Sequence, residues 1–232
     1  MKICIFSDIH GNQYALRAFI EKLRVFEINH FIFCGDIFGY NYGHAEVIDM
    51  LLGIKNLTLV LGNHDKNLLD AIQDPSIIDS LAEKYGNTYK SAPLHVNAGT
   101  HIEVLRSLRP LAEITFCGKR ILVVHGTNDA PLNGRLYPKD MGQLAALEGI
   151  DICVMGHTHF RLCERKGNTL FLNPGSLGQP RDKQKNCFAI LSLPECTVEF
   201  IDVHYDKSLL DAEIRENDMG NEKLLELLHR SG

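Results

Sequence analysis

The sequence predicts an α/β protein built around a sheet of short, buried strands. Five short apolar runs recur along the 232 residues, and segments with helical periodicity separate the first three of them. A cluster of polar residues directly follows each of the five runs. Because ligands bind beyond the carboxyl ends of strands in open α/β sheets, this placement favours a parallel or mixed sheet with polar groups gathered at one edge.

The five apolar runs are the predicted strands. They are rich in Val, Ile and Phe without strict alternation of polar and apolar residues, which is typical of strands buried on both faces. Their sequences are KICIF (2–6), HFIFC (30–34), LTLVL (57–61), ILVVH (121–125) and DICVM (151–155).

Two helices are predicted between the first three runs. In the first connection, apolar residues from Ala15 to Leu23 repeat at helical spacing, and Asn12 is a candidate N-cap. In the second connection, the segment AEVIDMLLG predicts a helix that ends at Gly53. The first sixty residues therefore predict a βαβαβ unit.

The remaining chain predicts an inserted helical region and a second group of strands. Residues 66–112 contain three helical patterns interrupted by Pro75, Gly86 and Pro93, and we expect them to form a helical cap within a single domain spanning 1–232. From residue 168 onward, the segments NTLFLN, CFAILSL and TVEFIDVHY predict antiparallel strands, and NEKLLELLHR predicts a terminal amphipathic helix.

Composition excludes several function classes. The chain has 24 Lys and Arg against 29 Asp and Glu, a net charge of −5, which argues against a nucleic acid polymer as partner. Seven cysteines form no CxxC pair and most lie in apolar runs, which suits a reducing compartment, so we expect a cytoplasmic protein. No apolar stretch approaches the ~20 residues of a membrane span, so no membrane association is expected, and the sequence does not indicate an oligomeric state.

The polar clusters form a set of candidate metal ligands. Two carboxylates, one amide oxygen and four imidazoles supply about the number of ligands that two divalent ions need. In a strand, side chains at i and i+2 face the same way. Asp8 and His10 have this spacing, and so do His157 and His159, so we expect each pair to hold metal from one side. Nitrogen and oxygen donors without thiolate favour Mn, Fe, Co, Ni or Zn over Mg or Ca. The candidates are Asp8, His10, Asp36, Asn63, His125, His157 and His159.

The motifs DxH, GD, GNHD, H and GHxH stand in this order, followed by Asn173-Pro174-Gly175-Ser176. In this respect the chain resembles the calcineurin-like metallophosphoesterase superfamily over most of residues 1–181, and within it the small bacterial and archaeal phosphodiesterases. The resemblance implies a four-layer α/β/β/α sandwich of two mixed sheets with a dinuclear metal centre. It assigns one metal to Asp8, His10, Asp36 and His159 and the other to Asp36, Asn63, His125 and His157, with Asp36 bridging and His64 near the scissile phosphate.

The sequence departs from one subclass of that superfamily. Phosphoprotein phosphatases and the related diadenosine tetraphosphate hydrolases carry GDxVDRG, whereas this chain has GDIFGYN at 35–41 and so lacks the second Asp and the Arg. Phosphate must therefore be held by the metals, by His64 or by another group. Tyr40, Asn41 and Arg181 are the candidate substrate-binding residues.

The sequence thus predicts metal-dependent hydrolysis of small or nucleotide-like phosphate esters. Phosphodiesters are the expected class, a metal-bridging hydroxide is the expected nucleophile, and manganese is the expected metal. His64 would protonate the leaving alkoxide or steady the developing charge. Three alternatives stay open: a phosphomonoesterase or nucleotide phosphatase, a nuclease, and a non-catalytic scaffold of the same fold that binds a partner protein.

Overall fold

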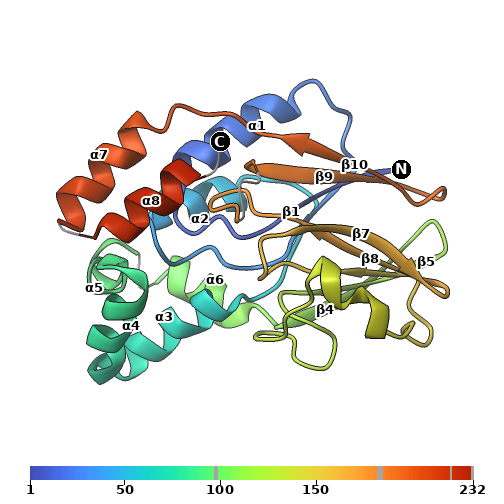
Figure 1. Ribbon diagram of the computed structural model, residues 1–232, viewed down its shortest axis with the longest axis horizontal. Helices are drawn as coiled ribbons and strands as arrows, with labels where there is room; N and C mark the ends of the chain where they lie inside the picture. The colour runs from blue at the N-terminus through green and yellow to red at the C-terminus, as the bar shows by residue number, and fades with distance from the viewer. Residues whose placement is uncertain (97–98, 182–184, 220, 231–232) are drawn as a thin grey trace.

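The apolar runs of the sequence form the centre of two mixed, five-stranded sheets in the computed structural model, which describes residues 1–96, 99–181, 185–219 and 221–230. The sheets pack face to face (Figure 1). In spatial order, sheet A contains β10 (Thr197–Asp202), β9 (Cys187–Ser192), β1 (Lys2–Phe6), β2 (His30–Phe33) and β3 (Leu57–Leu59). Sheet B contains β4 (Leu111–Phe116), β5 (Lys119–Val124), β6 (Ile152–Val154), β8 (Thr169–Pro174) and β7 (Arg161–Lys166).

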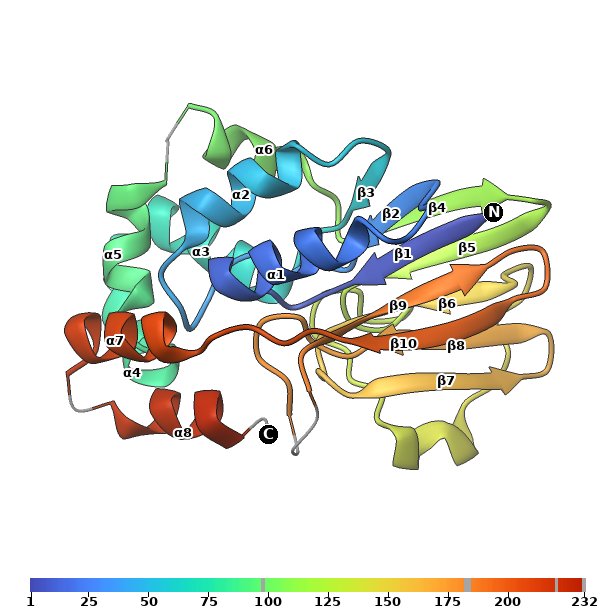
Figure 2. The same cartoon turned by 90° about the horizontal axis from the view of Figure 1, so that it is seen from above.

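The helices gather over one face of sheet A and at one end of both sheets (Figure 2). The α-helices are α1 (Gln13–Leu23), α2 (His44–Leu52), α3 (Asn63–Gln73), α4 (Ile78–Tyr85), α5 (Thr88–His95), α6 (His101–Ser107), α7 (Ser208–Asn217) and α8 (Glu222–Arg230). Two 3₁₀ helices, η1 (Pro75–Ile77) and η2 (Pro138–Gln143), accompany them. Within the described ranges, no helix combines the length and the apolar character that crossing a bilayer requires.

The predicted βαβαβ unit is confirmed. β1, α1, β2, α2 and β3 follow one another, and β1, β2 and β3 run parallel. The Asn12 side chain accepts a hydrogen bond from the backbone N–H of Ala15 at 3.0 Å, so it caps α1 as expected, and Gly53 ends α2. Parallel pairing places the carboxyl ends of these strands at one edge, where the polar clusters begin.

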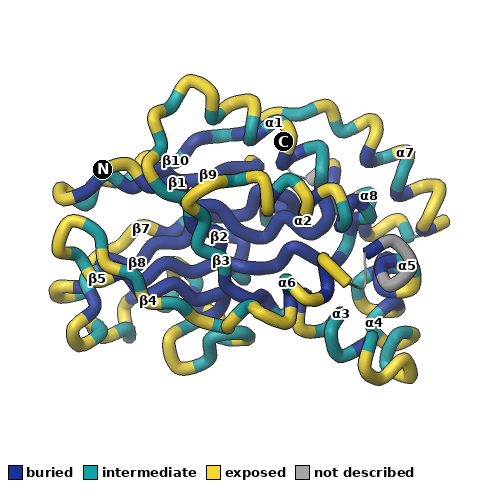
Figure 3. Tube along the Cα trace, turned by 180° about the vertical axis from the view of Figure 1, so that it is seen from behind, coloured by how far each residue is buried: buried dark blue, intermediate teal, exposed yellow. Residues whose placement is uncertain are grey.

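Three apolar layers hold the sandwich together. Between the sheets, residues such as Ile3 and Ile32 of sheet A pack with Val123 and Val154 of sheet B. The outer face of sheet A packs under α1 and α2, and the outer face of sheet B packs under segment 126–150, which contains η2. The four-layer sandwich is therefore present, and its fourth layer is a loop with a 3₁₀ helix. The buried strands form the dark centre of Figure 3, with exposed residues on the loops around it.

The sequence did not predict β4, β7, α5 or α7. β4 alternates exposed and half-buried residues at the edge of sheet B, so it lacks the apolar run that marked the other strands. α5 contains Pro93, which the sequence interpretation took as an interruption. The prediction of antiparallel strands after residue 168 holds for β9 and β10 but is wrong for one side of β8, which runs parallel to β6 and antiparallel to β7.

The segment 66–112 contains the three predicted helical patterns in α3, α4 and α6, and its last residues belong to β4. Residues 97 and 98 of this segment lie outside the described residues. The helices α7 and α8 lie at the same end of the molecule as α4 and α5 (Figures 1 and 2). Two separate parts of the chain therefore surround the edge of the sheets where the polar clusters lie.

Candidate metal centre

All seven candidate metal ligands lie at the edge where the strands of both sheets end. Asp8 follows β1, Asp36 follows β2, and Asn63 begins α3 just after β3. From sheet B, His125 follows β5, and His157 and His159 lie beyond β6. The structure thus brings together residues that are spread from position 8 to position 159 of the sequence. Six of them, together with His64, form three overlapping groups whose ligand atoms lie within 4.8 Å of one another: Asp8, His10 and His159; His10, Asp36 and His64; and Asp36, His125 and His157.

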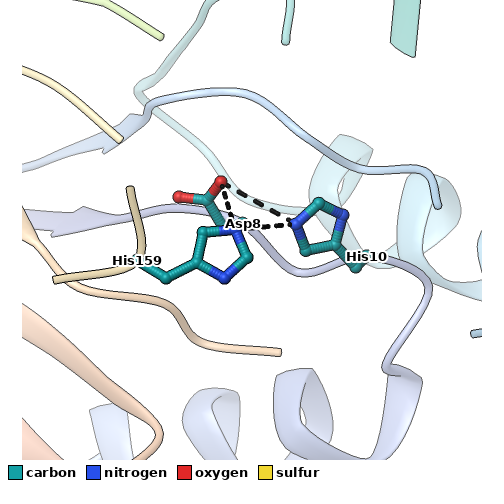
Figure 4. Close-up of side chains that lie close together, drawn as sticks. All are labelled: Asp8, His10 and His159. Atoms are coloured by element: carbon teal, nitrogen blue, oxygen red, sulfur yellow. Dashed lines mark hydrogen bonds and ion pairs between the residues drawn. The ribbon is translucent and has the colours of Figure 1, made fainter. Parts of the chain in front are cut away.

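The first group consists of Asp8, His10 and His159, whose side chains point toward one another (Figure 4). The Nε2 atoms of the two imidazoles are 3.1 Å apart. The Asp8 Oδ1 atom lies 3.2 Å from His159 Nε2 and 3.8 Å from His10 Nε2. One carboxylate oxygen and two ring nitrogens therefore face a common point.

The second group consists of Asp36, Asn63, His125 and His157. The His125 Nε2 atom is 3.0 Å from Asn63 Oδ1, 3.1 Å from His157 Nδ1 and 3.2 Å from Asp36 Oδ2. The same Asp36 Oδ2 atom lies 3.7 Å from His10 Nε2. Asp36 therefore stands between the two groups.

The other ring nitrogen of three imidazoles faces the backbone. The Nδ1 atoms of His10, His125 and His159 lie 2.6, 2.7 and 2.5 Å from the carbonyl oxygens of residues 38, 34 and 179. Because a carbonyl only accepts hydrogen bonds, these contacts assign a proton to each Nδ1 atom and leave a lone pair on each Nε2 atom of the neutral rings. The lone pairs converge on the carboxylates, and this is how metal-binding histidines are held. A cation fits among these donors.

The electrostatics of the group agree with this donor arrangement. Burial raises the pKa of Asp8, but His159 and His125 outweigh it and lower that pKa to about 2. Burial lowers the pKa of His157 to about 4, with a contribution from His125. Burial also lowers the pKa of His125, but Asp36 outweighs it and raises that pKa to about 9, so a positive charge is favoured beside Asp36. Metal binding requires ionised carboxylates and neutral imidazoles, so a cation beside Asp36 would displace the proton that this raised pKa favours on His125.

The backbone is left-handed at five of the seven candidate ligand positions. The φ angles are 55° at Asp8, 52° at His10, 65° at Asp36, 65° at His157 and 63° at His159. This region costs residues other than glycine about 1 kcal/mol or more, and such strain concentrates at functional sites. The side chains are aimed by these loops, because β1 ends at Phe6 and β6 ends at Val154.

The sequence analysis expected the pairs Asp8–His10 and His157–His159 to face one way because each would lie in a strand, and this reason was wrong. Neither pair lies within a strand, and strand alternation does not set the direction of the side chains. For His157 and His159 its result was wrong too, because His157 belongs to the group of Asp36 and His159 to the group of Asp8. Asp8 and His10 do share one group.

His64 lies beside both groups at the start of α3. Its backbone N–H donates to Asp36 Oδ1 at 2.8 Å, and its Nδ1 atom lies 2.8 Å from the hydroxyl of Tyr89. Its ring packs against Tyr85 and Tyr40, with centroids 4.5 and 5.1 Å away. Burial lowers the pKa of His64 to about 4. The sequence did not reveal Tyr89, because nothing in the sequence fixes how α5 faces the site.

Asp65 is a second residue that the sequence analysis missed, although it is the last residue of the GNHD motif. Its carboxylate accepts hydrogen bonds from the backbone N–H groups of Asp36, Ile37, Phe38 and Gly62 at 2.8 to 3.0 Å. These bonds tie the loop after β2 to the start of α3. Asp65 therefore holds Asp36 and Asn63 in place relative to one another.

A cavity of about 250 Å³ opens beside the two groups. Tyr40 and Arg181 line it, and the Arg181 guanidinium donates to the Tyr40 hydroxyl at 3.3 Å. Asn41 is placed differently, because its amide donates to the His10 carbonyl at 2.9 Å and it lies outside the residues that line this cavity. Three lining cations were not predicted: Lys84, Arg135 and Lys223.

Comparison with known proteins relates this site to a family. A model of the calcineurin-like phosphoesterase superfamily domain matches residues 1–195. An uncharacterized protein of Methanocaldococcus jannaschii is 27% identical over 221 residues, which cover 88% of each chain. The phosphodiesterase YfcE of Escherichia coli K12 is 22% identical over 200 residues, which cover 82% of this chain and 87% of that one. The structure of a metallophosphoesterase from Sphaerobacter thermophilus matches all of both chains with a TM-score of 0.79 at 23% identity. The chain belongs to the calcineurin-like phosphoesterase superfamily.

Proposed function

We propose that this protein is a phosphodiesterase that works with two divalent transition-metal ions. One observation carries the proposal: the Nε2 atoms of three buried imidazoles converge with two carboxylates, while each Nδ1 atom is held by a backbone carbonyl. Lone pairs that face one another at 3.1 Å repel unless a cation lies among them. The donor set therefore fits metal ions.

The proposed ligand sets share Asp36. Asp8, His10, Asp36 and His159 would hold one ion, and Asp36, Asn63, His125 and His157 would hold the other. The position of Asp36 Oδ2, 3.2 Å from His125 Nε2 and 3.7 Å from His10 Nε2, supports a bridging role. Manganese is the proposed metal, and the mixed nitrogen and oxygen donors also suit iron, zinc, nickel or cobalt.

When bound, such ions supply positive charge to the phosphate and water with a lowered pKa as the nucleophile. The chain itself contributes His64. The Tyr89 hydroxyl lies closer to His64 Nδ1, at 2.8 Å, than to the His64 carbonyl, at 3.4 Å, so the hydroxyl proton points to Nδ1. The neutral ring then carries its own proton on Nε2, and His64 lines the cavity. We assign to that N–H the hydrogen bond to the leaving oxygen of the ester.

The cavity favours a small substrate. Tyr40 and Arg181 line it and are the proposed substrate-binding residues, whereas Asn41 would act by fixing the backbone of His10. A diester is the proposed class, because the chain lacks the Asp and Arg that the phosphatase subclass places after its GD motif and is similar over most of its length to a protein that is named as a phosphodiesterase.

We further propose one domain over residues 1–232, with 66–112 as a cap. Support for the cap comes from Tyr85 and Tyr89, which contact His64. A cytoplasmic location is proposed from the cysteines, all seven of which are free thiols.

The alternatives make distinguishable claims. A nuclease would cleave polymers, for which the net charge of −5 is unfavourable. A phosphomonoesterase or nucleotide phosphatase would prefer nitrophenyl phosphate to bis-nitrophenyl phosphate. A protein-binding scaffold would need no metal, yet every ligand position of both sets is filled in this chain.

The test is metal analysis of the purified protein, followed by kinetics with Mn²⁺. We expect about two ions per chain and a higher kcat/KM for bis-nitrophenyl phosphate than for nitrophenyl phosphate. Protein that binds no divalent ion and cleaves no phosphate ester would overturn the proposal. A clear preference for the monoester would replace the diester class and leave the metal centre intact.

A further inference from the structure

Four cations surround the cavity beside the metal centre. Lys84 lies on α4, Lys223 lies on α8, Arg135 follows β5, and Arg181 follows β8. Among the described residues, the cavity lining contains a single carboxylate, that of Asp36, which belongs to the proposed metal ligands. In the same part of the chain, none of the four cations forms an ion pair with a carboxylate. This positive charge is therefore left for a ligand.

The two arginines already contact neighbouring residues of the site. Arg135 Nε donates to His157 Nε2 at 3.1 Å, and the Arg181 guanidinium lies 5.6 Å from the centre of the Tyr40 ring. The two lysines lie on helices that are far apart in the sequence, and their side chains are exposed. α8 lies beyond residue 195, where the match to the family model ends.

A simple phosphodiester cannot use so much positive charge. It carries one negative charge, and two divalent ions with Asp8 and Asp36 already exceed that charge. Four positive side chains around one small cavity repel one another and attract anions, most strongly at low salt. A ligand with a second anionic group would neutralise them.

The same lining limits the size of the ligand. The volume of about 250 Å³ is small, and the aromatic rings of Tyr40 and Tyr85 form part of its wall. The Lys84 ammonium lies 4.7 Å from the centre of the Tyr85 ring, so charge and aromatic surface stand side by side. This combination suits a small, nucleotide-like molecule.

From these contacts we infer that the natural substrate is a small phosphodiester with a second phosphate group, which Lys84 and Lys223 bind while the diester lies at the metal centre. The inference rests on the proposed function, because it names the substrate class of that site. A polymer would also present several phosphates, but each of its internal diesters carries only one charge and its chain must pass out of the cavity.

The test compares two substrates that differ only in the second phosphate. The nitrophenyl ester of thymidine 5′-phosphate and the same ester with an added 3′-phosphate release the same leaving group from the same bond. With Mn²⁺-loaded protein, we expect the 3′-phosphate to raise kcat/KM about tenfold or more at low salt, and this advantage to shrink at high salt. The substitutions Lys84→Gln and Lys223→Gln should each reduce the ratio between the two substrates about threefold to tenfold.

Lys90→Gln is the matched control. Lys90 lies on α5, pairs with Asp79 at 3.1 Å and does not line the cavity, so the same loss of charge should leave the ratio unchanged. A ratio near one in the unsubstituted protein, or equal ratios in all three variants, would overturn the inference. Faster cleavage of a thymidine oligonucleotide than of the bisphosphate would overturn it in favour of a polymer. Hydrolysis of bis-nitrophenyl phosphate tests the proposed function separately, since that ester lacks the second phosphate.

Discussion

Gly62 is the position where a single methyl group would test the geometry around Asp36. Gly62 has φ −93° and ψ 169°, an extended conformation that alanine adopts without strain. A Cβ atom there would lie 2.1 Å from Asp36 Oδ1 and 2.2 Å from Asp36 N. Gly62→Ala therefore perturbs the site through steric contact alone.

The size of the effect follows from these distances. Since non-bonded atoms need at least about 3 Å, Asp36 and residue 62 must separate by roughly 1 Å. That shift disturbs the bond from His64 N to Asp36 Oδ1 and the bond from Asp36 N to Asp65 Oδ2. Overpacking of this kind lowers the free energy of unfolding by about 1 to 3 kcal/mol, and a displacement of about 1 Å at a reacting centre costs about 100-fold in rate.

The assay measures metal content, urea unfolding and the hydrolysis of bis-nitrophenyl phosphate with Mn²⁺. Gly142→Ala is the matched control, because a Cβ atom at Gly142 would meet no atom within 4 Å. We expect Gly62→Ala to lose metal and about 100-fold in kcat/KM, and Gly142→Ala to retain both. A folded Gly62→Ala protein with two ions and a rate within threefold of the original would refute the tight placement of Asp36.

Three further predictions concern the site and the C-terminal helices. Asp36→Asn should abolish activity and lower metal content, because a neutral amide replaces the shared carboxylate; metal near two per chain with unchanged activity would contradict bridging. His64→Ala should keep both ions but lose about 10²- to 10⁴-fold in kcat, more for alkyl than for nitrophenyl leaving groups, and Tyr89→Phe should show a smaller loss of the same kind; loss of metal would place His64 among the ligands. Burial and neighbouring acidic groups raise the pKa of Glu213 from 4.5 to about 7, so the stability that its protonated form gives is present below pH 4.5 and lost as the pH rises through 7. Glu213→Gln should therefore raise the free energy of unfolding at pH 8 by about 1 kcal/mol, after discounting for partial exposure, and the gain should vanish toward pH 4.5; an equal gain at both pH values would contradict the titration.

The parts of the fold that were predictable carry local signals. β1, β2, β3 and the two helices between them follow from apolar runs, helical periodicity and the cap at Asn12, all of which act within a few residues. The edge strands β4 and β7 carry no comparable signal, because they are extended mainly as a result of pairing with β5 and β8. The parallel pairing of β8 with β6 is likewise a property of the assembled sheet.

The site was predictable to the same extent. The candidate ligands lie directly after strands, so the topology of the sheets brings them to one edge whatever conformation the loops adopt. The residues around the cavity lie on helices instead, and only tertiary packing decides which faces of α4, α5 and α8 turn toward the site. Lys84, Tyr89 and Lys223 were therefore beyond the reach of a pattern in the sequence.

The left-handed backbone at five of the candidate ligand positions bears on how the site is held in place. Five such residues together cost several kcal/mol, so other interactions must hold them. Asp65 accepts four backbone N–H groups around Asp36, and three backbone carbonyls each fix one imidazole through its Nδ1 atom. These bonds involve the backbone and the far sides of the rings, so none of them uses an atom that a metal would bind. The donors are therefore held in place without a metal, so the free energy of metal binding would not be spent on ordering them.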